Sequence, residues 1–197
     1  MKRLAYLAGA VILVASFVAT KAPATSAVPW YSVVESSCGR GTLATTHRLG
    51  LAIIEDEDTG DNSAEVADSR KLIRLADECE AALPTCTNAS NCDDAPSVFM
   101  GEQLLIAFSS LSPALAATGQ PGWESAFDRY ILEGIELCNS PHITNPQEPY
   151  KTARLFTADM LQKASTLSAT HTEPTMDANL DKLQACAARI GAQGVSF

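Results

Sequence analysis

The chain has 197 residues, with 14 Lys and Arg against 23 Asp and Glu, and a formal net charge of −9 at pH 7. This acidic balance argues against a nucleic-acid partner, which rewards clustered Lys and Arg, and against binding to an anionic membrane surface. The acidic charge is compatible with binding to a basic protein partner, with binding of cations, or with a gain in solubility alone.

The chain begins with the layout of a secretory signal peptide. Two basic residues precede an apolar run over residues 4–19, and small residues follow. This order predicts a signal peptide over residues 1–24, or a longer one that ends at Ala27. The competing interpretation is an uncleaved membrane anchor, but the run of about 16 residues is shorter than the about 20 that a spanning helix needs. We therefore expect a secreted or periplasmic protein with no stable membrane insertion, whose residues 28–197 form one soluble domain.

Helical periodicity dominates the rest of the chain. Residues 32–58 are the hardest to assign, because three glycines in this stretch each weaken a helix by about 1 kcal/mol relative to alanine. An interrupted helix is the prediction, with a short strand over residues 49–54 as the alternative. The next helix is predicted over residues 63–83 and ends at Pro84.

The remaining predicted helices have apolar residues at helical spacing and are separated by Gly- and Pro-bearing segments. They cover residues 96–118, 123–138, 150–169 and 176–190. Glu102 is interpreted as a first-turn residue, where the helix dipole favours a carboxylate. Together the segments predict an all-α, single-domain, disulfide-stapled antiparallel bundle of five to six helices.

Six cysteines in an exported chain predict disulfide bonds rather than thiol chemistry. They are Cys38, Cys79, Cys86, Cys92, Cys138 and Cys186. The predicted helix order favours one pairing among many: an αα-hairpin brings Cys38 to Cys79, and the ends of two parallel helices bring Cys138 to Cys186. The third pair is then left for a local bridge in a loop. The spacing does not suit zinc, which uses close cysteine pairs, and we predict no metal or other cofactor.

No catalytic motif stands out, since neither G-x-S-x-G nor H-E-x-x-H occurs. We expect a non-enzymatic protein, and keep as an alternative a hydrolase that uses His47 or His142 with nearby acids. His47 is placed to pair with Glu55 or Asp56 if these residues fold close together. Otherwise each histidine, His171 included, is interpreted as a surface or helix-face residue.

Two acidic patterns are interpreted as solvated surface. Residues 55–61 are strongly acidic, but neither possible register has both the glycine and the final glutamate of an EF-hand calcium loop, which favours a turn between two helices. Glu133 and Glu136 can share one helical face with no catalytic role, as paired acids do on many solvated helices. Asn88 begins an N-glycosylation sequence, which matters only in a eukaryotic secretory pathway.

The function that we expect is protein–protein interaction by an exported helical protein, as an inhibitor, immunity factor, effector or assembly component. Trp30, near the start of the mature chain, caps the base of the bundle or, as an alternative, anchors a partner. The alternative function is a carrier of a small apolar ligand in a cavity between helices. The residues expected to line that cavity are Leu104, Phe108, Phe127, Ile131, Phe156 and Met160.

Overall fold

A computed structural model describes residues 28–85, 93–157 and 174–190, without the side chains of residues 174–177. Four sequence predictions fall outside the described residues: the signal peptide, the Cys86–Cys92 bridge, the glycosylation sequence at Asn88, and the placement of Met160 and His171.

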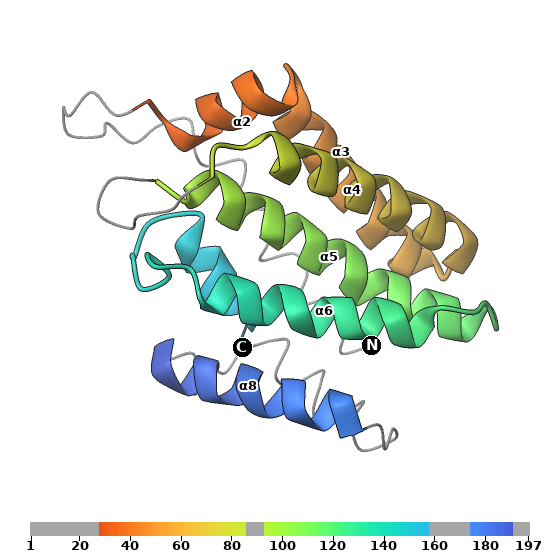
Figure 1. Ribbon diagram of the computed structural model, residues 1–197. Coiled ribbons are helices and arrows are strands. Elements are labelled where there is room, and N and C mark those ends of the chain that lie inside the picture. Colours follow the sequence, from red (N-terminus) through yellow and green to blue (C-terminus); the bar gives the residue numbers. More distant parts are fainter. Residues whose placement is uncertain (1–27, 86–92, 158–173, 191–197) are drawn as a thin grey trace.

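The described residues form helices and contain no strand, which confirms the predicted all-α bundle (Figure 1). The helices are α2 (Trp30–Cys38), α3 (Thr42–Thr59), α4 (Asn62–Ala82), α5 (Ala95–Ala117), α6 (Trp123–Cys138), a helical segment at residues 150–157, and α8 (Pro174–Ile190). This makes seven helices in the described part, whereas the sequence predicted five to six.

The additional helix arises where the predicted interrupted helix breaks completely, between α2 and α3. Gly39 and Gly41 adopt positive φ angles of 103° and 87°, which residues with a side chain rarely adopt. The Glu35 carboxylate accepts hydrogen bonds from the backbone N–H groups of Gly41 and Leu43, and so satisfies two donors at the start of α3. The alternative of a strand over residues 49–54 is wrong, because these residues lie within α3.

A turn joins α3 and α4 as the sequence indicates, but it consists of Gly60 and Asp61 alone, because the acidic residues 55–58 lie in the last turns of α3. Gly60 ends α3 with a φ of 73°, and its N–H bonds back to the last turn of the helix. Asp61 then caps α4 by accepting a hydrogen bond from the N–H of Ala64 at 3.0 Å. The turn makes α3 and α4 an antiparallel hairpin.

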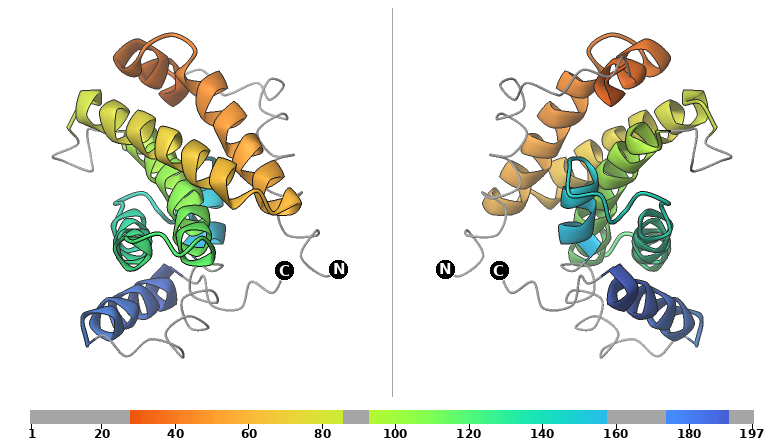
Figure 2. Two further views of the ribbon diagram at one scale, coloured as in Figure 1. Left: turned by 90° about the vertical axis from the view of Figure 1, so that its right-hand side faces the viewer. Right: turned by 90° about the vertical axis from the view of Figure 1, so that its left-hand side faces the viewer.

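Helix α5 is the centre of the bundle and packs against α2, α3, α4 and α6 (Figure 2). Its side chains Met100 and Leu104 are fully buried, and Leu105 is 2% exposed. The helix is long and apolar enough to cross a membrane by length and composition alone, but 78% of the relevant window is buried inside the bundle. A buried core helix meets the same criteria.

Two disulfide bonds match the predicted pairing. Cys38 is bonded to Cys79 with a Cα–Cα distance of 4.8 Å, and Cys138 to Cys186 with a distance of 6.0 Å. The second bond joins the C-terminal ends of α6 and α8, which run parallel as the predicted helix order requires (Figure 1). Each bond closes a long loop and is expected to stabilise the fold by roughly 3–4 kcal/mol. These bonds are compatible with an oxidising, extracellular or periplasmic location.

Candidate functional site

A buried carboxylate at the start of α5 gathers three side chains from other parts of the chain. Asp94 Oδ1 accepts hydrogen bonds from the Tyr150 hydroxyl and from His142 Nδ1, both at 2.6 Å, and Oδ2 accepts one from the Ser140 hydroxyl. Asp94 is 6% exposed, whereas the His142 side chain is 34% exposed. We call these four residues the Asp94 cluster.

Three elements position the Asp94 cluster. Asp94 directly precedes α5, Ser140 and His142 lie in the loop after α6, and Tyr150 begins the helical segment 150–157. Burial alone raises the pKa of a carboxyl, but the bonds from Ser140, Tyr150 and His142 outweigh it and lower the pKa of Asp94. Burial and the bond to Asp94 raise the pKa of Tyr150. The cluster therefore holds an ionised carboxylate at the junction of three segments.

The Asp94 cluster differs from a hydrolase triad. In a triad the serine bonds to the histidine, and the aspartate orients the same histidine from its other ring nitrogen. Here Ser140 donates to Asp94 instead, so the cluster has an acid–histidine pair but no serine aligned as its nucleophile. From the sequence, His142 was interpreted as a surface or helix-face residue, and its bond to Asp94 was missed because Asp94 resembles an ordinary acidic residue at a helix start.

A second buried carboxylate, Glu102, lies further along α5 and lacks such partners. Glu102 is 4% exposed, and its Oε1 atom has no hydrogen-bond partner. Burial, followed by the charge of Glu148, raises the pKa of Glu102 well above its usual value, and a hydrogen bond from the backbone of Ala153 only partly offsets this. The interpretation of Glu102 as a first-turn residue was wrong, since α5 begins at Ala95 and Glu102 faces the segment 150–157 from the buried side.

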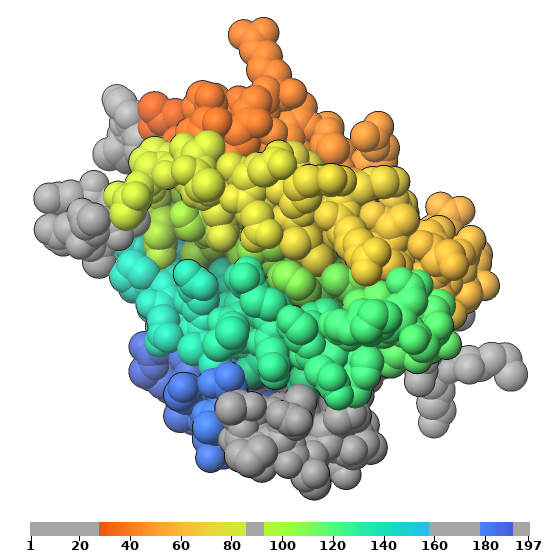
Figure 3. Space-filling view, turned by 45° about the vertical axis from the view of Figure 1, so that its right-hand side comes forward, coloured from red at the N-terminus to blue at the C-terminus, as the bar shows by residue number. Residues whose placement is uncertain are grey.

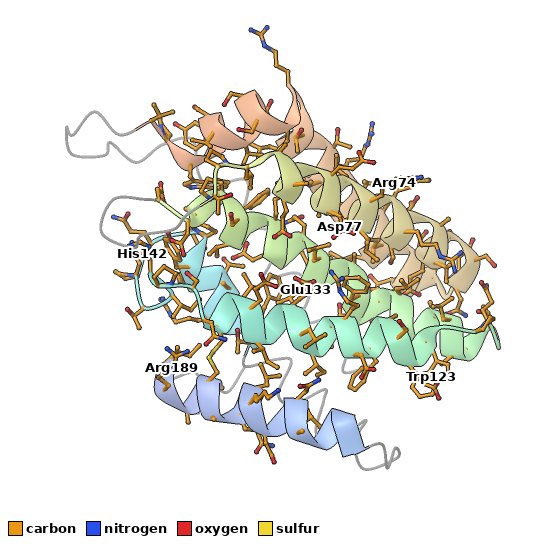
Figure 4. The ribbon with its side chains drawn as sticks, viewed as in Figure 1. Arg74, Asp77, Trp123, Glu133, His142 and Arg189 are labelled. Atoms are coloured by element: carbon orange, nitrogen blue, oxygen red, sulfur yellow. A yellow bond between two sulfur atoms is a disulfide. The ribbon has the colours of Figure 1, made fainter. Side chains whose placement is uncertain are left out.

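A third group of carboxylates lies where α4 and α6 flank α5. In Figure 3 the surfaces of α4 and α6 run next to each other, and Figure 4 shows Asp77 of α4 and Glu133 of α6 on this side. Arg129 bridges them, at 2.6 Å from Glu133 and 3.9 Å from Asp77. Its guanidinium also lies over the ring of Phe108, 5.6 Å from the centroid.

Negative charge exceeds positive charge on this surface. Glu80 is an exposed residue of α4, but desolvation of its carboxyl group, followed by the charges of Glu133, Glu136 and Asp77, raises the pKa of Glu80 to about 7, although Arg129 opposes the shift. Burial also raises the pKa of Glu133, again against the effect of Arg129. The interpretation of Glu133 as a solvated residue was wrong, because it is only 5% exposed; Glu136 is exposed as expected.

An open groove of about 480 Å³ follows α6 on this side of the molecule. The described residues that line it are Arg129, Leu132, Glu133, Ile135, Glu136 and Asn139. Leu132 is 44% exposed, one of four large apolar side chains that are exposed among the described residues, and the neighbouring Ile135 is partly buried. We call this surface, with Asp77 and Glu80 of α4 beside it, the acidic groove. It combines an apolar strip with carboxylates.

The other residues considered from the sequence for catalysis or ion binding do not come together in one site. His47 pairs with neither Glu55 nor Asp56 in the described structure, and its Nε2 atom has no hydrogen-bond partner. Burial and neighbouring acids raise the pKa of Asp56. Among the residues that the structure describes, no group of three His, Cys, Asp or Glu could hold a metal ion. Trp30 packs against Phe99, with ring centroids 5.0 Å apart.

The residues expected to line a ligand cavity are instead packed together. Leu104, Phe108, Phe127 and Ile131 belong to one core cluster, each at most 7% exposed, and the partly buried Phe156 packs against it. Their periodicity therefore reflects core packing in the described structure.

The acidic groove was missed because its residues come from α4 and α6, which are far apart in sequence. Only the ion pair between Arg129 and Glu133 could have been predicted from the sequence, because the two residues are four positions apart on one helix.

Comparisons with models of protein families, with known proteins and with solved structures found no match to this chain.

Proposed function

We propose that this protein acts outside the cytoplasm by binding another protein, and that the acidic groove is its recognition surface. The observation that carries the proposal is Leu132, a large apolar side chain left exposed beside charged groups in a groove along α6. Exposed apolar surface surrounded by polar residues is typical of protein-binding sites.

The architecture suits a binding role. Both disulfides anchor the helices that border the groove: Cys79 lies in α4 and Cys138 ends α6. A rigid surface loses little conformational entropy when a partner binds, which favours affinity. The predicted signal peptide and the six cysteines support an extracytoplasmic, disulfide-bonded protein, with secretion and the periplasm as the two proposed destinations.

The test is a comparison of two exposed leucines. A photo-crosslinking amino acid replaces Leu132 in one variant and Leu51 of α3 in the other, and the full chain is expressed in its native host and irradiated. Because Leu132 and Leu51 are 44% and 38% exposed, the two probes sample solvent to a similar extent. We expect a discrete crosslinked protein from position 132 and none from position 51. Identical patterns at the two positions, or no product at either, would contradict the proposal.

A further inference from the structure

We infer that the acidic groove binds a cationic amphipathic segment of its partner, with an apolar side chain on Leu132 and Ile135 and Lys or Arg side chains at Glu80 and Glu136. This inference rests on the proposed function and specifies the chemistry of the partner.

Charge is the first argument. Four carboxylates, of Asp77, Glu80, Glu133 and Glu136, act on one another around the single guanidinium of Arg129. Arg129 is already engaged with Glu133 and Asp77, and among the described residues no salt bridge joins Glu80 or Glu136 to a cation. An incoming ammonium or guanidinium group relieves their repulsion.

The apolar strip distinguishes a protein segment from a small cation. A metal ion needs converging oxygen ligands, and the described residues provide no such group of three. A simple cation also leaves Leu132 in water, whereas an amphipathic segment covers it. A second copy of this chain is disfavoured, because two proteins that each carry a net charge of −9 repel.

The length of the groove limits the segment. Its lining residues run along α6 from Arg129 to Asn139, which corresponds to roughly 15 Å at the rise of an α-helix. This length accommodates about three turns of a helix or about five residues of extended chain. A short recognition segment is therefore sufficient to fill it.

Binding of such a segment is linked to proton release. The groups that face Glu80 are Glu133 and Glu136 from α6 and Asp77 from α4, all acidic, together with Arg129. Because desolvation of its carboxyl group and the charges of these acids raise the pKa of Glu80 to about 7, part of the Glu80 population is protonated at neutral pH. A bound cation favours the ionised form, so binding strengthens as the pH rises from 6 to 8.

The test uses three synthetic helix-forming peptides of equal length that share a pair of leucines. One carries lysines beside the leucines, and the others carry glutamines or glutamates at the same positions. Binding to the full mature protein, with its disulfides intact, is measured by fluorescence anisotropy. We expect the lysine peptide to bind about tenfold more tightly than the glutamine peptide, equivalent to about 1.4 kcal/mol, and the glutamate peptide to bind least.

A matched pair of double variants separates groove contacts from general acidity. Glu80→Gln with Glu136→Gln removes two exposed carboxylates at the groove, whereas Glu55→Gln with Asp58→Asn removes two exposed carboxylates near the opposite end of α4. The first pair is expected to weaken binding of the lysine peptide about tenfold, and the second less than about twofold, because salt screens distant charges. Equal losses from both pairs, or equal binding of the lysine and glutamine peptides, overturn the inference.

The outcomes of the two experiments are separable. If position 132 captures a partner but the peptides show no charge preference, the proposed function stands and the inference about cationic segments fails. If the lysine peptide binds as expected but no partner is captured, the proposed function fails and the chemistry of the groove stands. Self-association of the protein through the groove, seen as a dimer in solution that the lysine peptide does not dissociate, also overturns the inference.

Discussion

Two buried carboxylates lie near the first half of α5, and their pKa values are shifted in opposite directions. Asp94 accepts hydrogen bonds from Ser140, His142 and Tyr150, and its pKa is lowered. Glu102, on the same helix, keeps one oxygen without a partner, and its pKa is raised. Both are at most 6% exposed, and burial raises the pKa of each carboxyl, but only Asp94 has enough donors to reverse this effect. The number of donors around a carboxylate decides whether the interior stabilises its charge or removes it.

The largest expected effect is the loss of the acceptor at the satisfied site. Asp94→Ala leaves three donors from separate segments without their shared partner, and should lower the free energy of unfolding by about 3 kcal/mol. Urea denaturation of the oxidised protein measures this. Asp93→Ala is the matched control, because Asp93 mainly accepts a bond from the N–H of Ala95, a capping contact worth about 1 kcal/mol. Equal losses in the two variants would show that the bonds from Ser140, His142 and Tyr150 contribute no more than the single capping contact of Asp93.

The dependence of stability on pH should also separate the two kinds of carboxylate. Glu65 resembles Glu102 in that burial raises its pKa. Burial, followed by the charges of Glu57 and Asp56, raises the pKa of Glu65 from 4.5 to about 7. The unfolded chain releases this proton near pH 4.5, whereas the folded chain keeps it until about pH 7. Stability contributed by Glu65 is therefore lost as the pH rises through this window, by about 3 kcal/mol. Asp94 acts in the opposite sense, because its lowered pKa makes stability fall as the pH drops below 3.8.

Urea midpoints measured from pH 3 to pH 8 are expected to peak at roughly pH 4–5. Glu65→Gln should reduce the decline between pH 4.5 and pH 7, of which Glu80 contributes a further part, and leave the acid side of the curve unchanged. A profile that rises steadily from pH 4.5 to pH 8 would mean that Glu65 is ionised in the folded protein, contrary to our assignment.

A smaller effect, of opposite sign to that of Asp94→Ala, is expected from Glu102→Met. Methionine has a similar length and needs no hydrogen bond, so it removes an unpaired buried oxygen and should raise the free energy of unfolding at pH 8 by about 1 kcal/mol. The N–H of Ala153 keeps an acceptor, because it also bonds to the carbonyl of Pro149 at 3.0 Å. The gain should shrink at pH 4, where the unfolded chain is protonated as well. A loss of stability at both pH values would indicate that Glu102 has a partner essential to the fold.

Sequence patterns predicted the framework of the bundle better than its polar interior. The helix around Phe127 and Ile131 was placed at its observed bounds, because apolar periodicity and flanking glycines report directly on packing and capping. The pairing of Cys138 with Cys186 followed from helix order alone. Asp94 could not be assigned its role, since its donors lie in a loop and a helix start far along the chain, and only the folded backbone brings them together. Glu102 was misplaced for the same reason, because its environment depends on where residues 150–157 pack.

The smallest effect tests whether the Asp94 cluster acts as one unit. His142 is one-third exposed, so water already weakens its bond to Asp94, and His142→Ala should cost about 1 kcal/mol. In the Asp94→Ala background the same substitution should cost almost nothing, because the bond is already lost. The resulting coupling energy of about 1 kcal/mol, obtained from a double-mutant cycle in urea, measures the contact itself. If the two substitutions are simply additive, His142 stabilises the loop through its own packing, and Asp94 is satisfied by Ser140 and Tyr150 alone.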